Sequence, residues 1–538
     1  MADRVSAEDA ASGAVARRVA LGGGLSLAAI GRGAVAAAGL HVLASAEQAG
    51  AYDHVIVGAG SAGCVLAHRL ARGRRRVLLV EAGGVARSPA IADPPEWPRL
   101  QGSEYDWRYA TVPQPGLGGR VVGCPRGKVV GGSSAINALA YQRGHPAGYE
   151  SWPAGWRAAE LLPFFRRAES FSGGANAWRG GDGPLHVLSL ADVTDRTPLA
   201  EGFVAAAREL GFPMSPDIGG EIATGVAWNQ LSIRGRVRDD AATAYLGRLE
   251  GATVDVLAGT AVLGLVMEGR RCVGVRLAET VLRPRGDVLL CAGAIDSPRL
   301  LMLSGIGPAD QLAGLGIPVV QDLPEVGRNL EDHLLVAGVA YAARREVPRS
   351  HYNHADALLY VPRGDPGESP EQLVMCLSLP YVMPGLGPVP APAYVLLPCL
   401  MRPRSRGSVR LASADPRQPA VIDPGYLAEP EDLEVLVRAV ALAREIGAGA
   451  GFADWRAREV HPGPGADLRD FVRRAANSFH HPAGSCGMRA VVDEALRVRG
   501  VAGLRVIDAS VFPAIPQAMI NAATIAVAEK ASDLLLAG

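Results

Sequence analysis

Two short groups of residues in this sequence have the types and spacing that chemistry requires. The first is a glycine-rich turn, Gly58-Ala59-Gly60-Ser61-Ala62-Gly63, followed by the acidic residue Glu81. Gly58 permits a tight turn, Gly60 lets the backbone approach a pyrophosphate, and Gly63 allows a helix to pack closely on a strand. Glu81 stands where a carboxylate accepts hydrogen bonds from a ribose, and an acid there disfavours a 2′-phosphate. This spacing predicts a dinucleotide site.

The second group is the histidine pair His480-His481, which Pro482 and Gly484 follow. Imidazole titrates near neutral pH, so a histidine can take or release a proton during a reaction. Adjacent histidines rarely converge on one metal ion. The seven cysteines are scattered, odd in number and never spaced as C-x-x-C, which argues against a zinc site and a disulfide framework. The sequence therefore predicts no metal. Taken alone, either histidine is a core residue or an acid–base catalyst.

The elements around the glycine-rich turn are expected to position it. Residues 53–57, DHVIV, predict a buried strand, and residues 61–71 continue at helical spacing. Residues 77–80, VLLV, predict a second strand. The N-terminus of the helix between them would present N–H groups and a positive dipole end to phosphates. Residues 287–291 and 504–508 predict further strands that end at loops, the junctions where α/β sheets bind ligands.

Two longer segments resemble the signature patterns of the glucose-methanol-choline (GMC) flavoenzyme family. They are residues 127–137, GKVVGGSSAIN, and residues 293–307, GAIDSPRLLMLSGIG. Residues 323–333, LPEVGRNLEDH, also match, and the resemblance implies that they form a structural element near the flavin. Further matches lie at 404–416, 480–488 and 504–510, so the resemblance covers nearly everything from Tyr52 to the C-terminus. It implies an FAD-dependent oxidoreductase acting on an alcohol.

The resemblance implies that His481 takes the hydroxyl proton while hydride passes from the substrate carbon to flavin N5. General base catalysis of this kind contributes about 10²–10⁴-fold. The Pro-x-Gly spacing aligns the base with His481, not with His480. The second polar residue of the family site matches Met519, whose thioether cannot act as acid or base. Either Asn521 helps to hold the substrate oxygen, with a contact to the flavin as its first role, or His481 works alone.

The resemblance also assigns residues to the cofactor. Covalent members of the family attach flavin through a histidine where this chain has Ile136, so we expect non-covalent FAD. A closing helix that starts near Asn521 is expected to direct its positive dipole end at the flavin N1–C2 side. The residues assigned to FAD are Gly58, Gly60, Ser61, Gly63, Glu81, Gly131, Ser133, Asn137, Val262, Asp508, Ala509 and Asn521.

The expected fold class is mixed α/β, with two domains in 538 residues. A Rossmann-like FAD-binding domain is assembled from the separated segments 51–335 and 475–538, and residues 336–474 form a sheet-based substrate-binding domain. The expected function is oxidation of an alcohol to an aldehyde or ketone, with oxygen or another electron acceptor. One alternative is a non-redox reaction like that of hydroxynitrile lyases on the same scaffold. Another is a flavin-binding protein without catalysis.

Composition restricts the partners. Lys+Arg and Asp+Glu both number 54, so no global positive field is available to bind nucleic acid. The resemblance to the GMC family implies a small-molecule alcohol as the partner. No apolar run reaches the ~20 residues of a membrane-spanning helix. Residues 1–50 differ from the rest: Arg17-Arg18, an apolar run and Ala44-Ser45-Ala46 resemble a twin-arginine export signal, although Arg32 interrupts it. The alternative is an Ala-rich tail, so both a cytoplasmic and an exported protein stay open.

Overall fold

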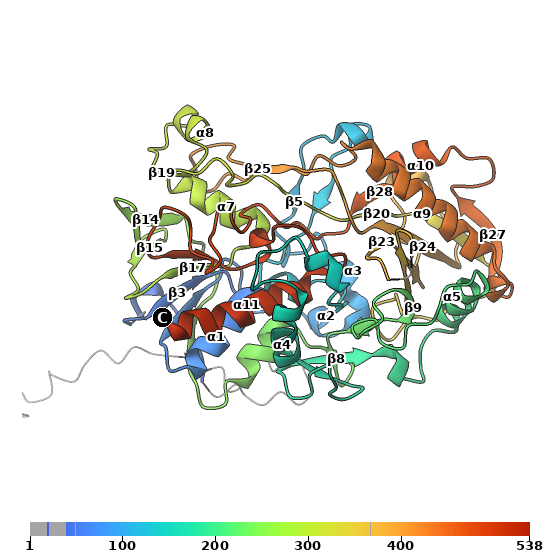
Figure 1. Ribbon diagram of the computed structural model, residues 1–538, viewed down its shortest axis with the longest axis horizontal. Coiled ribbons are helices and arrows are strands. Elements are labelled where there is room, and N and C mark those ends of the chain that lie inside the picture. Colours follow the sequence, from blue (N-terminus) through green and yellow to red (C-terminus); the bar gives the residue numbers. More distant parts are fainter. Residues whose placement is uncertain (1–18, 21–38, 49, 366) are drawn as a thin grey trace, which may run out of the picture.

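The predicted dinucleotide unit is present as a strand, a turn, a helix and a second strand. The computed structural model describes residues 19–20, 39–48, 50–365 and 367–538 (Figure 1). In it, β3 (His54–Val57) leads through the glycine turn into α1 (Ser61–Arg72), and β4 (Val77–Val80) follows. Both strands are almost fully buried, because helices or loops cover both faces of a parallel sheet.

These strands belong to a seven-stranded sheet with the order β1-β2-β13-β4-β3-β17-β29. Neighbouring strands from β2 to β29 are parallel, and β1 pairs antiparallel at the edge. Helices α1 and α11 pack against each other beside this sheet (Figure 1). The further elements are β1 (Val19–Ala20), β2 (Leu40–Val42), β13 (Val254–Leu257), β17 (Val288–Leu290), β29 (Leu504–Val506) and α11 (Ile520–Ala537).

Strand β2 lies within residues 1–50, the segment that the sequence assigns to a tail or an export signal. It pairs in parallel with β13, and Leu40 and Leu43 are buried. Nδ1 of His41 lies 3.1 Å from Oδ1 of Asp255. Arg17-Arg18 and residues 21–38 lie outside the described residues. The small-residue stretch 44–46 follows β2 directly, so cleavage there would remove a strand from the sheet.

A second, antiparallel sheet has the strand order β27-β21-β24-β23-β22-β9, with β20 paired to both β24 and β28. Two of its strands, β9 and β28, lie outside residues 336–474, in the segments that the sequence analysis assigns to the FAD-binding domain. The sheet is therefore built from more segments of the chain than the predicted substrate-binding domain contains. The strands are β9 (Gly225–Trp228), β20 (Leu334–Val336), β21 (Val339–Ala343), β22 (Ala357–Pro362), β23 (Pro370–Leu377), β24 (Ala393–Leu400), β27 (Arg456–His461) and β28 (Ala476–Ser478).

Both faces of this sheet are apolar. Alternate residues of β23 point to opposite faces, so Val374 and Cys376 join a cluster with helices α5 and α9, while Met375 and Leu377 join a different cluster on the other side. All eight residues of β23 are therefore buried. The helices on the first face are α5 (Pro198–Glu209), α9 (Pro430–Ala448) and α10 (Leu468–Ala475).

The remaining elements connect the two sheets. Among the described residues, no helix combines the length and apolar character needed to cross a bilayer. A small antiparallel sheet consists of β14 (Gly264–Glu268), β15 (Arg271–Arg276) and β16 (Val281–Leu282). Other helices and short strands are α4 (Ala158–Ala168), α6 (Ala241–Tyr245), α7 (Gly293–Leu303), α8 (Ala309–Gly314), β7 (Glu169–Phe171) and β10 (Gln230–Leu231).

Candidate active site

A cavity of about 960 Å³ is lined by residues of both sheets. On one side it meets the carboxyl ends of the parallel strands: Gly58 follows β3, Glu81 follows β4, Cys291 follows β17 and Asp508 comes just after β29. Parallel strands end at a common edge, and α/β sheets bind their ligands in the crevice outside it. The predicted nucleotide site therefore lies in this cavity.

Two glycine turns meet at the floor of the cavity. Gly58 has φ +100°, and a Cβ there would stand 2.5 Å from the carbonyl oxygen of Cys291. A Cβ on Gly132 would stand 2.5 Å from Cα of Gly60. Side chains at these positions would clash with neighbouring backbone, so the bare turns leave room along the cavity for a ligand to approach the chain.

Two glycines assigned to the cofactor do not line the cavity. A Cβ on Gly63 would stand 1.9 Å from the carbonyl oxygen of Gly58, so Gly63 allows α1 to pack on the turn, as its place in the motif predicts. Gly131 has φ +105°, and its N–H donates to the carbonyl oxygen of Ala59 at 2.8 Å. Both residues shape the turns and do not face the cavity.

Glu81 lines the cavity and also holds the glycine turn. Its Oε2 accepts a hydrogen bond from the N–H of Ala59 at 2.9 Å, and its Oε1 accepts one from the N–H of Gly83 at 2.8 Å. Burial raises the pKa of Glu81 to about 7, against the opposing effect of these two N–H donors. Each carboxylate oxygen has a second lone pair, which leaves acceptor capacity for a ribose hydroxyl.

Two helix N-termini open into the cavity. The N-cap residues of α1 and α11 are Gly60 and Met519, and neither helix has a side-chain cap. The hydroxyl of Ser61 donates to Oδ1 of Asn521 at 2.6 Å and so links the first turns of the two helices. Uncapped N–H groups and two positive dipole ends at one cavity favour anionic groups on a ligand.

The other residues assigned to the cofactor have mixed roles. The carboxylate of Asp508 accepts from the N–H of Gly293 at 2.9 Å and from the hydroxyl of Ser297 at 2.6 Å, so it anchors the start of α7. Oδ1 of Asn137 accepts from Nη1 of Arg238 at 2.9 Å. Ser133, Asn137, Val262, Asp508 and Ala509 all line the cavity.

These features fit FAD. Bare glycine turns at a helix N-terminus suit a pyrophosphate, Glu81 suits a ribose, and the start of α11 suits the electron-rich edge of a flavin. Ile136 lines the cavity, and its alkyl side chain has no atom that could bond to the ring. In the described part of the chain, no group of three or more His, Cys, Asp or Glu side chains could hold a metal ion.

His481 lines the cavity and is held by residues just before β20. Its backbone N–H donates to Oδ1 of Asp332 at 2.7 Å. Its Nδ1 lies 3.0 Å from Nδ1 of His333, and its ring centroid lies 4.5 Å from that of Phe479. Nε2 has no hydrogen-bond partner among the described residues. One ring nitrogen is thus engaged by the protein while the other is left for a ligand.

Electrostatics keep His481 neutral. Burial lowers its pKa well below the usual value, and the positive charge of Arg126 lowers it further. A neutral imidazole has one unprotonated ring nitrogen and can accept a proton. The arrangement can therefore serve as a base. In His480, the neighbouring residue, both ring nitrogens are buried and have no hydrogen-bond partner within the described part of the chain.

The contribution of Asp332 and His333 does not follow from the sequence analysis, which places residues 323–333 only near the flavin. They lie 149 and 148 positions before His481, respectively, so no local spacing joins them to it. The one feature of the sequence that could have indicated their role is the Asp-His pair at the end of residues 323–333. Met519, the departure from the family pattern, is 5% exposed and lines the cavity.

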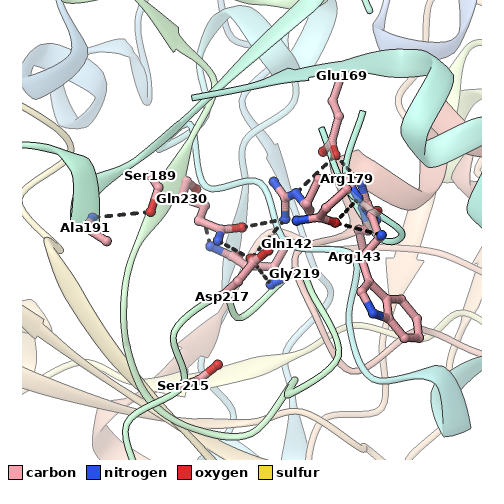
Figure 2. Close-up of polar contacts among 12 residues, drawn as sticks. Gln142, Arg143, Glu169, Arg179, Ser189, Ala191, Ser215, Asp217, Gly219 and Gln230 are labelled. Atoms are coloured by element: carbon pink, nitrogen blue, oxygen red, sulfur yellow. Dashed lines mark hydrogen bonds and ion pairs between the residues drawn. The ribbon is translucent and has the colours of Figure 1, made fainter. Parts of the chain in front are cut away.

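A buried ionic network supports the segment that leads from the cavity wall. Residues 138–140 line the cavity, and Arg143, a few residues further on, bonds to Oε1 of Glu169 (Figure 2). Nε of Arg179 lies 3.1 Å from the same oxygen. All three side chains are buried, so two cations share one carboxylate, and Arg179 has a second carboxylate partner in Asp217, whose Oδ1 lies 3.3 Å from Nη1.

Comparison with known proteins agrees with this geometry. The family model described as GMC oxidoreductase matches residues 52–335 with its N-terminal part and 403–528 with its C-terminal part. The chain is 38% identical to pyridoxine 4-oxidase of Microbacterium luteolum over 89% of its length and 98% of that protein. It is 38% identical to mitochondrial choline dehydrogenase of Mus musculus, over 90% of this chain and 89% of that protein.

Solved structures show the same fold. The crystal structure of pyridoxine 4-oxidase from Mesorbium loti superposes with a TM-score of 0.86 at 38% identity, over 90% of this chain and 98% of that one. The predicted mixed α/β fold class, the FAD cofactor and the oxidoreductase class are confirmed. On both its sequence and its structure, the chain belongs to the GMC oxidoreductase family.

Proposed function

We propose that the protein oxidises an alcohol to an aldehyde or ketone, with His481 as the general base. The observation that carries the proposal is the state of the His481 ring: Nδ1 is held at 3.0 Å by His333, while Nε2 is left unpaired at the cavity. The alcohol loses its hydroxyl proton to Nε2 and a hydride from its carbinol carbon to FAD, which is two electrons in all. FAD supplies the hydride acceptor at flavin N5, and oxygen or another acceptor then takes the electrons.

The direction of the histidine–histidine hydrogen bond decides which nitrogen is basic. Burial lowers the pKa of His333 to about 3, so its ring is neutral and has one proton. Nε2 of His333 is buried and has no hydrogen-bond partner among the described residues, while Nδ1 faces His481. We assign the proton of His333 to Nε2, which leaves the Nδ1 lone pair for His481. His333 then accepts at Nδ1, His481 donates from Nδ1–H, and Nε2 of His481 is the free lone pair.

Asp332 fixes the backbone on which this ring stands. One of its oxygens accepts from the N–H of His481, and the other accepts from Ser478 at 2.6 Å and from Tyr426 at 2.5 Å. The carboxylate is therefore fully engaged and cannot move toward a substrate. Asp332 and His333 act as positioning residues that orient the base. Asn521 lies in the first turn of α11, where it accepts a hydrogen bond from Ser61 in the first turn of α1.

Anaerobic mixing with alcohols tests the proposal. The holoenzyme should lose its oxidised-flavin absorbance near 450 nm with one class of alcohol. His481→Ala should slow this bleaching by about 10²–10⁴-fold, while His351→Ala, an exposed histidine outside the cavity, should not. A lyase would turn over without bleaching the flavin, so turnover without bleaching contradicts the proposal.

A further inference from the structure

The cavity has a second end whose chemistry differs from that of the nucleotide end. Its lining there comes from the inner face of the antiparallel sheet and from residues beside it. We call this lining the apolar wall; it consists of Leu335, Met375, Leu377, Leu397, Phe479 and Met519. These six residues belong to one hydrophobic cluster, so they form a continuous surface.

Strand register builds the wall. Met375 on β23 lies opposite Leu397 on β24, and Leu335 on β20 lies opposite Cys399, two residues further along β24 on the same face. Met519, the N-cap of α11, packs into the cluster from the other domain. Three strands and one helix therefore present aliphatic and thioether side chains to the same space.

The wall adjoins the base. The ring of Phe479 packs on the wall cluster and lies 4.5 Å, centroid to centroid, from the ring of His481. A substrate whose hydroxyl reaches Nε2 of His481 must therefore place its neighbouring atoms near Phe479, and Met519 lines the same cavity as part of the wall. At Met519 the side chain offers no strong hydrogen-bond donor or acceptor.

Charge at the cavity disfavours a cationic substrate. Three carboxylates line it, Glu81, Asp296 and Asp508, and none belongs to the antiparallel sheet. Each is already engaged: Asp296, for example, accepts from Tyr109 at 2.8 Å and pairs with Arg299 at 3.2 Å. Five cations line the same cavity, namely Arg108, Arg126, Lys128, Arg299 and Arg417.

Among the residues that line the cavity, the charge next to the base is also positive. Arg126 donates to the backbone carbonyl of His480, the residue beside His481. Asp332, which contacts the His481 backbone, does not line the cavity. The aromatic residues Trp97 and Tyr381 pair with each other at 6.2 Å, and no carboxylate accompanies them at the wall. A quaternary ammonium would lose its hydration there without a compensating anion.

We propose that the substrate is an uncharged alcohol whose carbinol carbon carries an apolar group large enough to cover the wall, such as a benzylic or branched alkyl alcohol, and that choline-like cations are excluded. This inference rests on the proposed alcohol oxidation and specifies its substrate class. Met519 and the wall select the substrate by burying apolar surface, which is favourable in proportion to area.

Two alcohols of the same shape test the role of charge. Choline and 3,3-dimethylbutan-1-ol differ in that a quaternary nitrogen replaces a quaternary carbon. With the holoenzyme under anaerobic conditions, the neutral alcohol and benzyl alcohol should bleach the flavin at least about 100-fold faster per molar substrate than choline. Met375→Glu should narrow the ratio by at least about 10-fold, because it places a carboxylate on the wall; Met375→Gln, which is polar but uncharged, should leave the ratio unchanged.

The outcomes separate the two proposals. If choline bleaches the flavin as fast as its neutral isostere, the substrate class proposed here is wrong and alcohol oxidation stands. If no alcohol bleaches the flavin of the wild-type holoenzyme, both proposals fail. If the Met375 variants do not retain FAD, the ratio measured with the wild-type holoenzyme decides the matter alone.

Discussion

Replacing His333 tests whether a hydrogen bond to Nδ1 makes His481 a base. When His481 takes a proton, its Nδ1–H becomes part of a cation, and its bond to Nδ1 of His333 strengthens. Neutral hydrogen bonds contribute about 0.5–1.5 kcal/mol and charged ones about 1.5–3 kcal/mol. The transition state therefore gains about 0.5–2 kcal/mol from His333, which corresponds to about 2–30-fold in rate. Loss of the tautomer preference adds to this, up to the 10²–10⁴-fold of the whole base.

Three substitutions at this position separate hydrogen bonding from packing. His333→Leu and His333→Gln remove the acceptor at Nδ1, and we expect both to slow anaerobic flavin reduction by about 30-fold or more with little change in KM. His333→Asn places an amide oxygen where Nδ1 stands, so it should restore most of the rate. Rates are compared per bound FAD, so that loss of cofactor from this fully buried site does not count as loss of catalysis.

Two results would refute the reasoning. If His333→Leu reduces its flavin within twofold of the wild-type rate, the 3.0 Å contact has no role in the reaction. If His333→Asn is as slow as His333→Leu, the position matters for packing and not for the hydrogen bond.

Three other predictions concern stability. Glu169→Gln leaves Arg143 buried beside a neutral amide, while Arg179 keeps Asp217, and should destabilise the holoenzyme by about 3–5 kcal/mol, seen as a lower Tm. Glu434→Gln, in an exposed ion pair, should not lower Tm. Burial lowers the pKa of His68 to about 4, so the unfolded chain binds a proton at this residue before the folded chain does. As the pH falls from 6.5 to 4, the free energy of unfolding of the wild type should decrease by about 1.4 kcal/mol per pH unit relative to that of His68→Asn. A difference in unfolding free energy that does not change with pH would contradict this. Deleting residues 1–46 removes the buried Leu40 and Leu43 and should lower Tm, whereas deleting residues 1–38 should lower Tm less. If the two truncated proteins have the same Tm, β2 does not contribute to the stability of the protein.

The parts of the site that sequence analysis can predict are those written in local patterns. The glycine turn, its flanking strands and Glu81 lie within about thirty residues, and period and glycine spacing suffice to place them. Glu81 nevertheless has a second function that spacing does not reveal, because its oxygens also bind the N–H groups of Ala59 and Gly83. The role of Gly131 was equally hidden, since a positive φ is a property of the folded turn.

The parts that sequence analysis misses depend on register between distant strands. Met375 and Leu377 differ from Val374 and Cys376 only in the face that they occupy, and a strand that is apolar on both faces shows no alternation to tell them apart. Likewise, nothing near His481 in the sequence indicates that β20 brings His333 to its ring. These contacts form only when the antiparallel sheet assembles.

The assembly of the two sheets gives one cavity two kinds of lining. The parallel sheet ends in bare turns and helix N-termini, which suit an anionic cofactor. The antiparallel sheet contributes an apolar face, which suits an uncharged group. His481 stands where they meet, on the chain just after β28. Strand β20 pairs with β28 and so brings His333, the residue before β20, to the His481 ring. A change in the register of β20 against β28 would therefore alter the base and the apolar wall together, because Leu335 belongs to the wall and His333 precedes it by two residues.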